Sequence, residues 1–206
     1  MDYKTIKEYA TDEFVEKKSR FIGYIMPVKT EKEATDFIAM ISKKHFDATH
    51  NVYAYILRDG QIKRYSDNGE PQGTAGIPVL DVLQKEGLVD VCVVVTRYFG
   101  GIMLGAGGLV RAYSHGAVVA VRAAHIMNMT TCCEVTLECE YTLYGKLSYI
   151  FPNFNIRVVD SDFSAAVKIG LLIRKDRFDA FMKEITNISN GQVVPYVTGE
   201  VFEDME

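Results

Sequence analysis

The sequence predicts an α+β protein of two domains, at residues 1–130 and 131–206. The chain has 206 residues, a length typical of one large domain or two small ones. After Thr130 the segments follow the order βαββαβ, the split βαβ arrangement that about 75 residues can form alone. Charge changes at the same place. The first part has 16 Lys and Arg against 15 Asp and Glu, whereas the second has 7 against 12.

In the first domain, apolar patterning predicts strands, which we expect at 3–10, 14–18, 20–27, 51–57, 61–66 and 90–96. The first turn is expected at Thr11-Asp12, and Arg58-Asp59-Gly60 is typical of a hairpin. The last strand contains VCVVV, which favours burial on both faces. Helical spacing predicts helices from Thr30 to about Lys44, up to about Gly87, and from Gly107 onward. Thr30 and Glu33 form a capping box at the first of these helices.

In the second domain the same reasoning gives four strands and two helices. Strands are expected at 132–141, 155–160, 164–174 and 192–202, and a helix at 143–151. The middle strands should turn at Ser161-Asp162, and Asp176 should cap the second helix. This order matches a ferredoxin-like βαββαβ domain.

Composition points to a cytoplasmic protein without membrane association. No apolar run reaches the roughly 18 residues that cross a bilayer, and the polar N-terminus lacks the apolar core of a signal peptide. The four cysteines contain no CxxC pair and are expected to be buried free thiols. A net charge of −4 gives no global case for nucleic acid, but any anionic partner should meet the first domain.

The stretch RYFGGIMLGAGGLVRAYSHGA (97–117) has five glycines in its first twelve residues, between a strand and a helix. Free backbone N–H groups at a helix N-terminus suit an anion, and Arg97 and Arg111 flank the stretch. Neither GxxxxGK[ST] nor GxGxxG is present, which disfavours a standard nucleotide loop. Two interpretations remain: an anion or backbone-recognition site, or small residues that let the helix pack closely on the sheet.

The loop Asp67-Asn-Gly-Glu70-Pro71 places two carboxylates three residues apart. They could ligate a cation or hold an arginine. The alternative is an Asx-type turn with Glu70 capping the next helix. An ion pair to Arg97 or Arg111 would reconcile the two. His50 is a candidate to join Asp67 and Glu70 in one polar cluster.

The run Lys17-Lys-Ser-Arg20 suits contact with a phosphate backbone. A solvated strand edge protected by lysines is an equal alternative. No GxSxG elbow is present, and Cys92 lies within the apolar strand, so nucleophilic catalysis has no support.

Two long motifs carry a family resemblance. RYSDNGEPQGTAGIPVLDVL (64–83) and VVVTRYFGGIMLGAGGLVRAY (93–113) closely resemble the signature of the IMPACT/YigZ family. KKSRFIGYI (17–25) and HNVYAY (50–55) lie at the expected relative places, and the resemblance covers essentially the whole chain.

The resemblance implies an N-terminal α+β sandwich of the superfold shared by a ribosomal protein, elongation factor G domain IV and GHMP-type kinases. It also implies a ferredoxin-like C-terminal domain. Eukaryotic IMPACT proteins regulate translation, and bacterial members look like RNA- or ribosome-associated proteins.

We therefore expect a non-enzymatic, translation-associated regulator that binds RNA or the ribosome through its first domain. Cellular stress is a candidate condition under which it acts. The residues assigned to nucleic-acid or anion binding are Lys17, Arg20, Arg97, Tyr98, Gly100, Gly101, Gly105, Gly107, Gly108 and Arg111. No catalytic residue, metal or cofactor is assigned, and a protein partner is a further candidate. The alternative function is a hydrolase or phosphotransfer enzyme acting on a small phosphorylated or peptide substrate, with the glycine loop as anion cradle.

Overall fold

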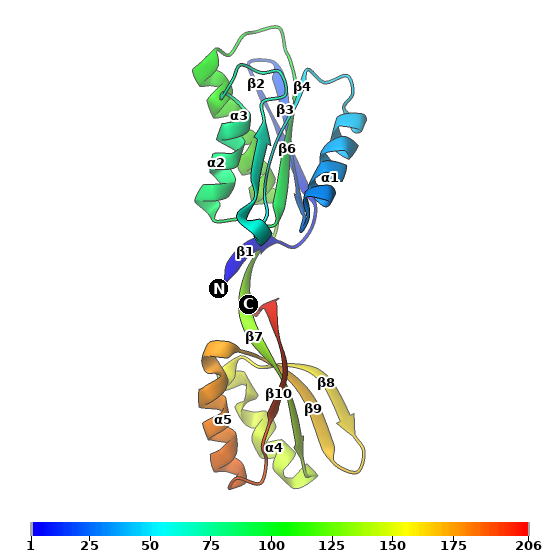
Figure 1. Ribbon diagram of the computed structural model, residues 1–206, viewed down its shortest axis with the longest axis vertical. Coiled ribbons are helices and arrows are strands. Elements are labelled where there is room, and N and C mark those ends of the chain that lie inside the picture. The colour runs from blue at the N-terminus through cyan, green and yellow to red at the C-terminus, as the bar shows by residue number, and fades with distance from the viewer. Residues whose placement is uncertain (1, 206) are drawn as a thin grey trace. The chain divides into compact units, whose positions relative to one another are not determined.

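The structure, a computed structural model, describes residues 2–205 and divides into two compact units. One unit spans Tyr3–Met127, and the other consists of the remaining described residues. Figure 1 shows the elements of each unit in chain order.

The first unit is built on an antiparallel five-stranded sheet in the order β2-β3-β6-β4-β5. These strands are β2 (Ala10–Glu16), β3 (Ser19–Pro27), β4 (His50–Ile56), β5 (Lys63–Ser66) and β6 (Val91–Tyr98). The short β1 (Tyr3–Ile6) forms an isolated parallel bridge between Lys4 and Leu88.

Helices cover both faces of this sheet, which gives the expected α+β sandwich (Figure 1). α1 (Glu31–Lys44) lies on one face, and α2 (Gly76–Glu86) and α3 (Ala106–Ala123) lie on the other. Alternate residues of β6 enter the two cores, because successive strand side chains point to opposite faces. Val93 and Val95 pack beneath α2 and α3, whereas Cys92 and Val94 pack beneath α1. The VCVVV segment of the strand is therefore buried on both faces, as predicted.

α3 lies unusually close to the sheet. A Cβ at Gly23 of β3 would overlap the carbonyl oxygen of Gly116 on α3. A Cβ at Gly116 would lie 2.7 Å from a methyl carbon of Val95. Small residues thus allow close packing at the middle of α3.

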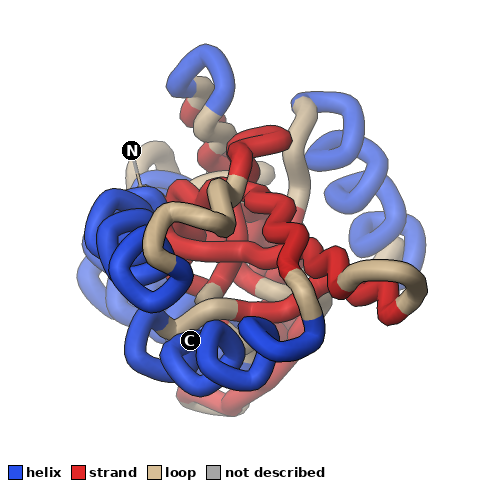
Figure 2. The backbone as a smooth tube through the Cα atoms, turned by 90° about the horizontal axis from the view of Figure 1, so that it is seen from below, coloured by secondary structure: helices blue, strands red, loops and turns tan. Residues whose placement is uncertain are grey.

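The second unit has the predicted βαββαβ order. Its strands are β7 (Ile126–Cys139), β8 (Arg157–Phe163), β9 (Val167–Arg174) and β10 (Tyr196–Asp204), and its helices are α4 (Tyr141–Ile150) and α5 (Lys175–Ser189). Neighbouring strands are antiparallel in the order β10-β7-β9-β8, and α4 and α5 share one core with the sheet. Figure 2 shows the whole backbone as a tube, with helices in blue and strands in red. This is the ferredoxin-like arrangement.

Two predicted turns are misplaced. Thr11 and Asp12 lie within β2, and the chain instead reverses at Lys17-Lys18, where both residues have positive φ angles of 45° and 68°. Such a two-residue turn normally favours asparagine and glycine, so lysines do not reveal it. In the second unit, Ser161 and Asp162 belong to β8, and the turn follows at 164–166.

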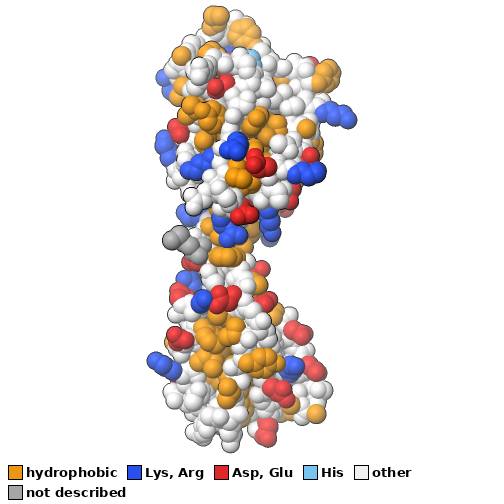
Figure 3. All heavy atoms as spheres, viewed as in Figure 1, with side chains coloured by type: hydrophobic (Ala, Val, Ile, Leu, Met, Phe, Trp, Pro, Cys, Tyr) orange, Lys and Arg blue, Asp and Glu red, His pale blue; other side chains and the backbone are white. Residues whose placement is uncertain are grey.

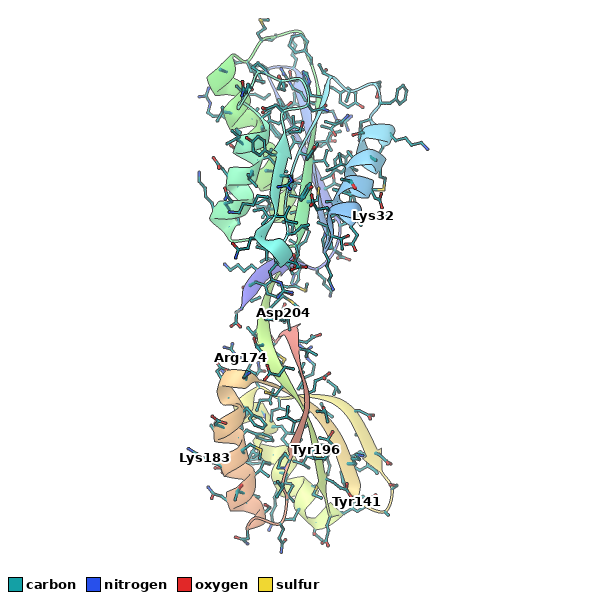
Figure 4. The ribbon with its side chains drawn as sticks, in the orientation of Figure 1. Lys32, Tyr141, Arg174, Lys183, Tyr196 and Asp204 are labelled. Atoms are coloured by element: carbon teal, nitrogen blue, oxygen red, sulfur yellow. The ribbon has the colours of Figure 1, made fainter. Side chains whose placement is uncertain are left out.

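The predicted cap at Asp176 is also wrong. Arg174 is the N-cap residue of α5, and Asp176 lies in the first helical turn. Its carboxylate accepts at 2.8 Å from the guanidinium of Arg174, a residue labelled in Figure 4. The Thr30 cap is confirmed, because its hydroxyl accepts from the Glu33 amide at 3.1 Å.

The four cysteines are free and buried, as predicted. Among the described residues, none of the helices combines the length and the apolar character needed to cross a bilayer.

Candidate functional site

A buried ion pair joins the 67–76 loop to β6. Arg97 Nη1 lies 2.6 Å from Glu70 Oε1, and the two side chains are 6% and 4% exposed. The Tyr113 hydroxyl on α3 donates to the same carboxylate oxygen at 2.7 Å. Burial, and then the bond to Glu70, raises the pKa of Tyr113 far above its ordinary value. Glu70 therefore links three elements and does not cap α2.

Arg97 is held between aromatic rings but is not fully satisfied. Its guanidinium carbon lies 5.5 Å from the ring centre of Phe21 and 5.4 Å from that of Phe99. Its Nε atom is buried without a hydrogen-bond partner within residues 2–205. An unpaired donor on a buried charged group is costly, so this atom indicates either strain or a missing acceptor.

Asp67, and not Glu70, accepts hydrogen bonds from the backbone that leads into α2. Its two carboxylate oxygens accept from the amides of Gly73, Ala75 and Gly76 at 2.8–3.0 Å. Burial alone would raise the pKa of Asp67, but the three backbone donors outweigh it and hold the pKa below its ordinary value. Both oxygens are thus used by the loop itself, and within the part of the chain described here no cluster of three or more His, Cys, Asp or Glu could hold a metal.

His50 meets Glu70 at the edge of this loop. Its Nδ1 lies 2.7 Å from the carbonyl oxygen of Asn68, so Nδ1 carries the proton that it donates. Its Nε2 lies 3.7 Å from Glu70 Oε1, beyond a hydrogen bond. The structure thus brings His50 and Glu70 together, while Asp67 is turned toward the α2 amides.

His50, Glu70 and Arg97 line a cavity of about 360 Å³, which we call the loop pocket. Its apolar walls are Pro71, Phe99, Met103, Leu104, Ala106 and Leu109. Its polar members are Thr49, His50, Glu70 and Arg97, with Gly105 at the start of α3. Phe99 and Met103 are 48% and 86% exposed, so the mouth of the pocket is apolar and open.

A second cavity of about 450 Å³, which we call the hairpin groove, lies between the β2–β3 turn and α3. Its basic members are Lys17, Arg111 and His115, all exposed, with Glu16 as an acidic member. The remaining walls are Phe14, Val15, Leu104, Gly108 and Ala112. Leu104 lines both cavities, which therefore adjoin.

The glycines between residues 100 and 108 differ in their backbone conformation and in the atoms around them. A Cβ at Gly100 would overlap the backbone of Lys18, and the Gly100 amide donates to the Ser19 hydroxyl at 3.2 Å. Gly100 therefore lets the β6 end pack on the hairpin turn. Gly101 and Gly105 have positive φ angles of 82° and 69°, with open space around them. Gly107 also has room, its nearest neighbour being Arg111 Nη1 at 3.7 Å.

The assigned binding residues are thus divided among several environments. Arg97 is buried, whereas Lys17 and Arg111 line the hairpin groove. Arg20 is exposed but pairs with Glu13 at 2.6 Å. Tyr98 points to the α1 face, where its hydroxyl contacts His45 Nδ1 at 2.8 Å.

Sequence reasoning missed His115 and Phe99. His115 packs edge-on against Phe14, with ring centres 4.4 Å apart, and so completes the groove across from Lys17. A lone histidine within a helix gives no pattern that predicts this. Figure 3 shows that acidic and basic side chains are mixed over the face in view, so local geometry, not overall charge, distinguishes the groove.

Family models match both parts of the chain. The Impact N-terminal domain matches residues 17–121, and a domain of unknown function, DUF1949, matches residues 137–192.

Whole-chain relatives carry the same family name. The chain is similar to IMPACT family member YvyE of Bacillus subtilis, with 38% identity over 92% of this chain and 88% of the relative. It is 33% identical to IMPACT family member YigZ of Escherichia coli, over 86% and 88% of the two chains. Protein IMPACT of Bos taurus is 34% identical over 44% of this chain and 30% of its own length. A solved structure described as a hypothetical protein matches with a TM-score of 0.60 and 30% identity, covering 96% of this chain and 98% of that one.

Proposed function

The chain belongs to the IMPACT family, and on this premise we propose that it is a cytoplasmic, translation-associated regulator that binds structured RNA, such as that of the ribosome. Binding occurs at the hairpin groove of the first unit. The observation that carries the proposal is the placement of Lys17, Arg111 and His115 around one open cavity.

The groove suits a phosphate backbone for electrostatic reasons. Lys17 and Arg111 are exposed, and neither has an ion pair within the described chain. Contacts of cations with phosphates release counterions and supply most of the sequence-independent affinity for nucleic acid. Arg20 and Arg97 contribute less, because each is already paired with a carboxylate.

The groove also presents backbone donors. Leu109 is the first residue of α3 whose amide donates within the helix, to the Gly105 carbonyl. The amides of Ala106, Gly107 and Gly108 precede it, and the first turn of a helix carries partial positive charge. An RNA phosphate at this end of α3 would meet both the amides and the two cations.

The test measures binding of structured ribosomal RNA by fluorescence anisotropy at several salt concentrations. The double variant Lys17→Gln/Arg111→Gln should bind more weakly, with a salt dependence reduced by roughly one unit of slope per lost phosphate contact. The control Lys43→Gln/Lys85→Gln removes two exposed cations of the same unit from α1 and α2. Equal affinity of both double variants would contradict the proposal.

Ribosome association is tested separately by sedimentation of the full chain with ribosomes. Cosedimentation should disappear in the Lys17→Gln/Arg111→Gln variant and after nuclease treatment. Cosedimentation that survives both would assign the contact to a ribosomal protein and not to RNA.

A further inference from the structure

The loop pocket and the hairpin groove adjoin but differ in charge. In the loop pocket Arg97 and Glu70 neutralise each other, and most of the wall is apolar. In the groove, Lys17 and Arg111 outnumber the single acidic residue, Glu16. One ligand that fills both must therefore have an uncharged, largely apolar part next to an anionic part.

The loop pocket is suited to a planar ring. The Phe99 ring is half exposed at its wall, and ring stacking on such side chains is favourable for every base. The polar side chains that line the loop pocket can form hydrogen bonds with the edge of such a ring. In the neutral ring of His50, Nδ1 carries the proton and Nε2 can accept. The hydrogen bonds that Arg97 and Tyr113 donate to Glu70 both use Oε1.

Two independent observations point to an occupant of this region. The Nε atom of Arg97 is an unpartnered donor on a side chain that is only 6% exposed and lines the loop pocket. The first turn of α3 places Ala106 in the loop pocket and Gly108 in the groove, with the open Gly107 between them. The amides of that turn thus lie where the two cavities join.

From this arrangement we propose that the two cavities together bind one nucleotide unit. Its base lies in the loop pocket beside Phe99, and its phosphate lies at the α3 N-terminus near Lys17 and Arg111. The inference rests on the proposed RNA binding and makes it specific: the element bound is an unpaired nucleotide, whose base is free to enter a pocket. A free mononucleotide shares this chemistry and is the second source to be tested.

The experiment compares two RNA hairpins of equal length, one fully paired and one with a two-nucleotide bulge. Binding is measured by anisotropy at one salt concentration. The bulged hairpin should bind about tenfold more tightly, as expected for one stacked base. Phe99→Ala should remove this preference. Because Phe99 also contacts Arg97, Met103→Glu provides a second variant at a side chain that is 86% exposed.

The control is Phe46→Glu, which changes an apolar side chain that is 87% exposed and lies just beyond α1. It should keep the preference for the bulge. Equal binding of both hairpins by the unchanged protein would overturn the site for an unpaired nucleotide of RNA. If the Lys17→Gln/Arg111→Gln variant then still bound RNA more weakly, the proposed function would stand without it.

A mononucleotide arm separates the two sources. Titration with AMP, GMP, CMP and UMP is followed by NMR shifts of the Phe99 and Gly107 amides. Saturable shifts that Met103→Glu abolishes, together with no preference between hairpins, would assign the site to free nucleotides. Absence of both the shifts and the preference would remove the site altogether.

Discussion

Glu70 and Arg97 form an ion pair 2.6 Å long inside the first unit, although 27 residues separate them in the chain. The pair fixes the 67–76 loop to the end of β6 and sets the base of the loop pocket. Its removal should therefore affect both stability and the pocket.

We expect Glu70→Gln to destabilise the protein by about 3–5 kcal/mol, because it leaves the Arg97 charge buried without its partner. Urea unfolding measures the change. Glu13→Gln is the matched control, since it breaks the Arg20 pair at a site where both side chains are about half exposed. That change should cost about 1 kcal/mol or less. Similar losses in the two variants would show that the buried pair is not a major source of stability.

Gly100→Ala should destabilise by about 1–3 kcal/mol, the usual cost of forcing an extra group into packed structure. The new methyl would overlap the Lys18 backbone, so the hairpin turn must move. Hydrogen exchange at Lys18 and Ser19 should accelerate. Gly145→Ala on α4 has nothing within 4 Å and should instead stabilise by about 0.5–1 kcal/mol. A neutral Gly100→Ala would refute the close approach.

Asp67→Ala should cost about 1–2 kcal/mol at pH 7, because the amides of Gly73, Ala75 and Gly76, which lead into α2, lose their acceptor. The pKa of Asp67 is lower in the folded than in the unfolded chain. Its contribution is therefore fully present well above pH 3.8 and is lost as the pH falls through the folded pKa. The free energy of unfolding of Asp67→Ala should therefore fall less steeply at acid pH. Asp81→Ala, which removes an exposed carboxylate of α2, should leave the decline at acid pH unchanged.

His45 should make the stability of the protein depend on pH near neutrality. Burial, then the charges of Lys44 and Arg20, lowers its pKa below 6.5. Neutral His45 lies 2.6 Å from the Tyr24 hydroxyl and 2.8 Å from that of Tyr98. As the pH falls, His45 is protonated in the unfolded chain before it is protonated in the folded chain. The contribution of His45 to stability is therefore fully present above about pH 6.5 and is lost as the pH drops below it.

The measurement is the urea midpoint between pH 7.5 and 5.5. His45→Gln should reduce the decline, whereas the exposed His125→Gln should retain it. A decline of the same size in His45→Gln would assign the pH dependence to another group.

The sequence predicted the elements whose cause is local. Thr30 and Glu33 mark a helix start by themselves, and five apolar residues in a row in β6 require cover on both faces. The Lys17-Lys18 turn was not predictable, because nothing in lysine favours positive φ. The turn exists because β2 and β3 pair in that register and Gly100 leaves room beside it.

For the candidate site, the sequence identified the residue types and predicted an ion pair of the loop with Arg97 or Arg111, but it did not decide between the two arginines. Arg97 and Arg111 flank the same glycines, yet one is buried with Glu70 and the other lines the hairpin groove. The two carboxylates of the 67–70 loop also have different partners. Asp67 accepts from the first amide of α2, and Glu70 pairs with Arg97 of β6. Such choices depend on where separate elements meet in space, which spacing along the chain does not encode.

The contact of Gly100 with Lys18 and Ser19 joins segments 81 residues apart. Because the two walls of the hairpin groove come from the β2–β3 turn and from α3, neither half of the first unit contains all the residues that line it. During synthesis the N-terminal hairpin emerges long before its opposite wall. A nascent chain that ends before α3 lacks Arg111, Ala112 and His115 and therefore cannot form the hairpin groove.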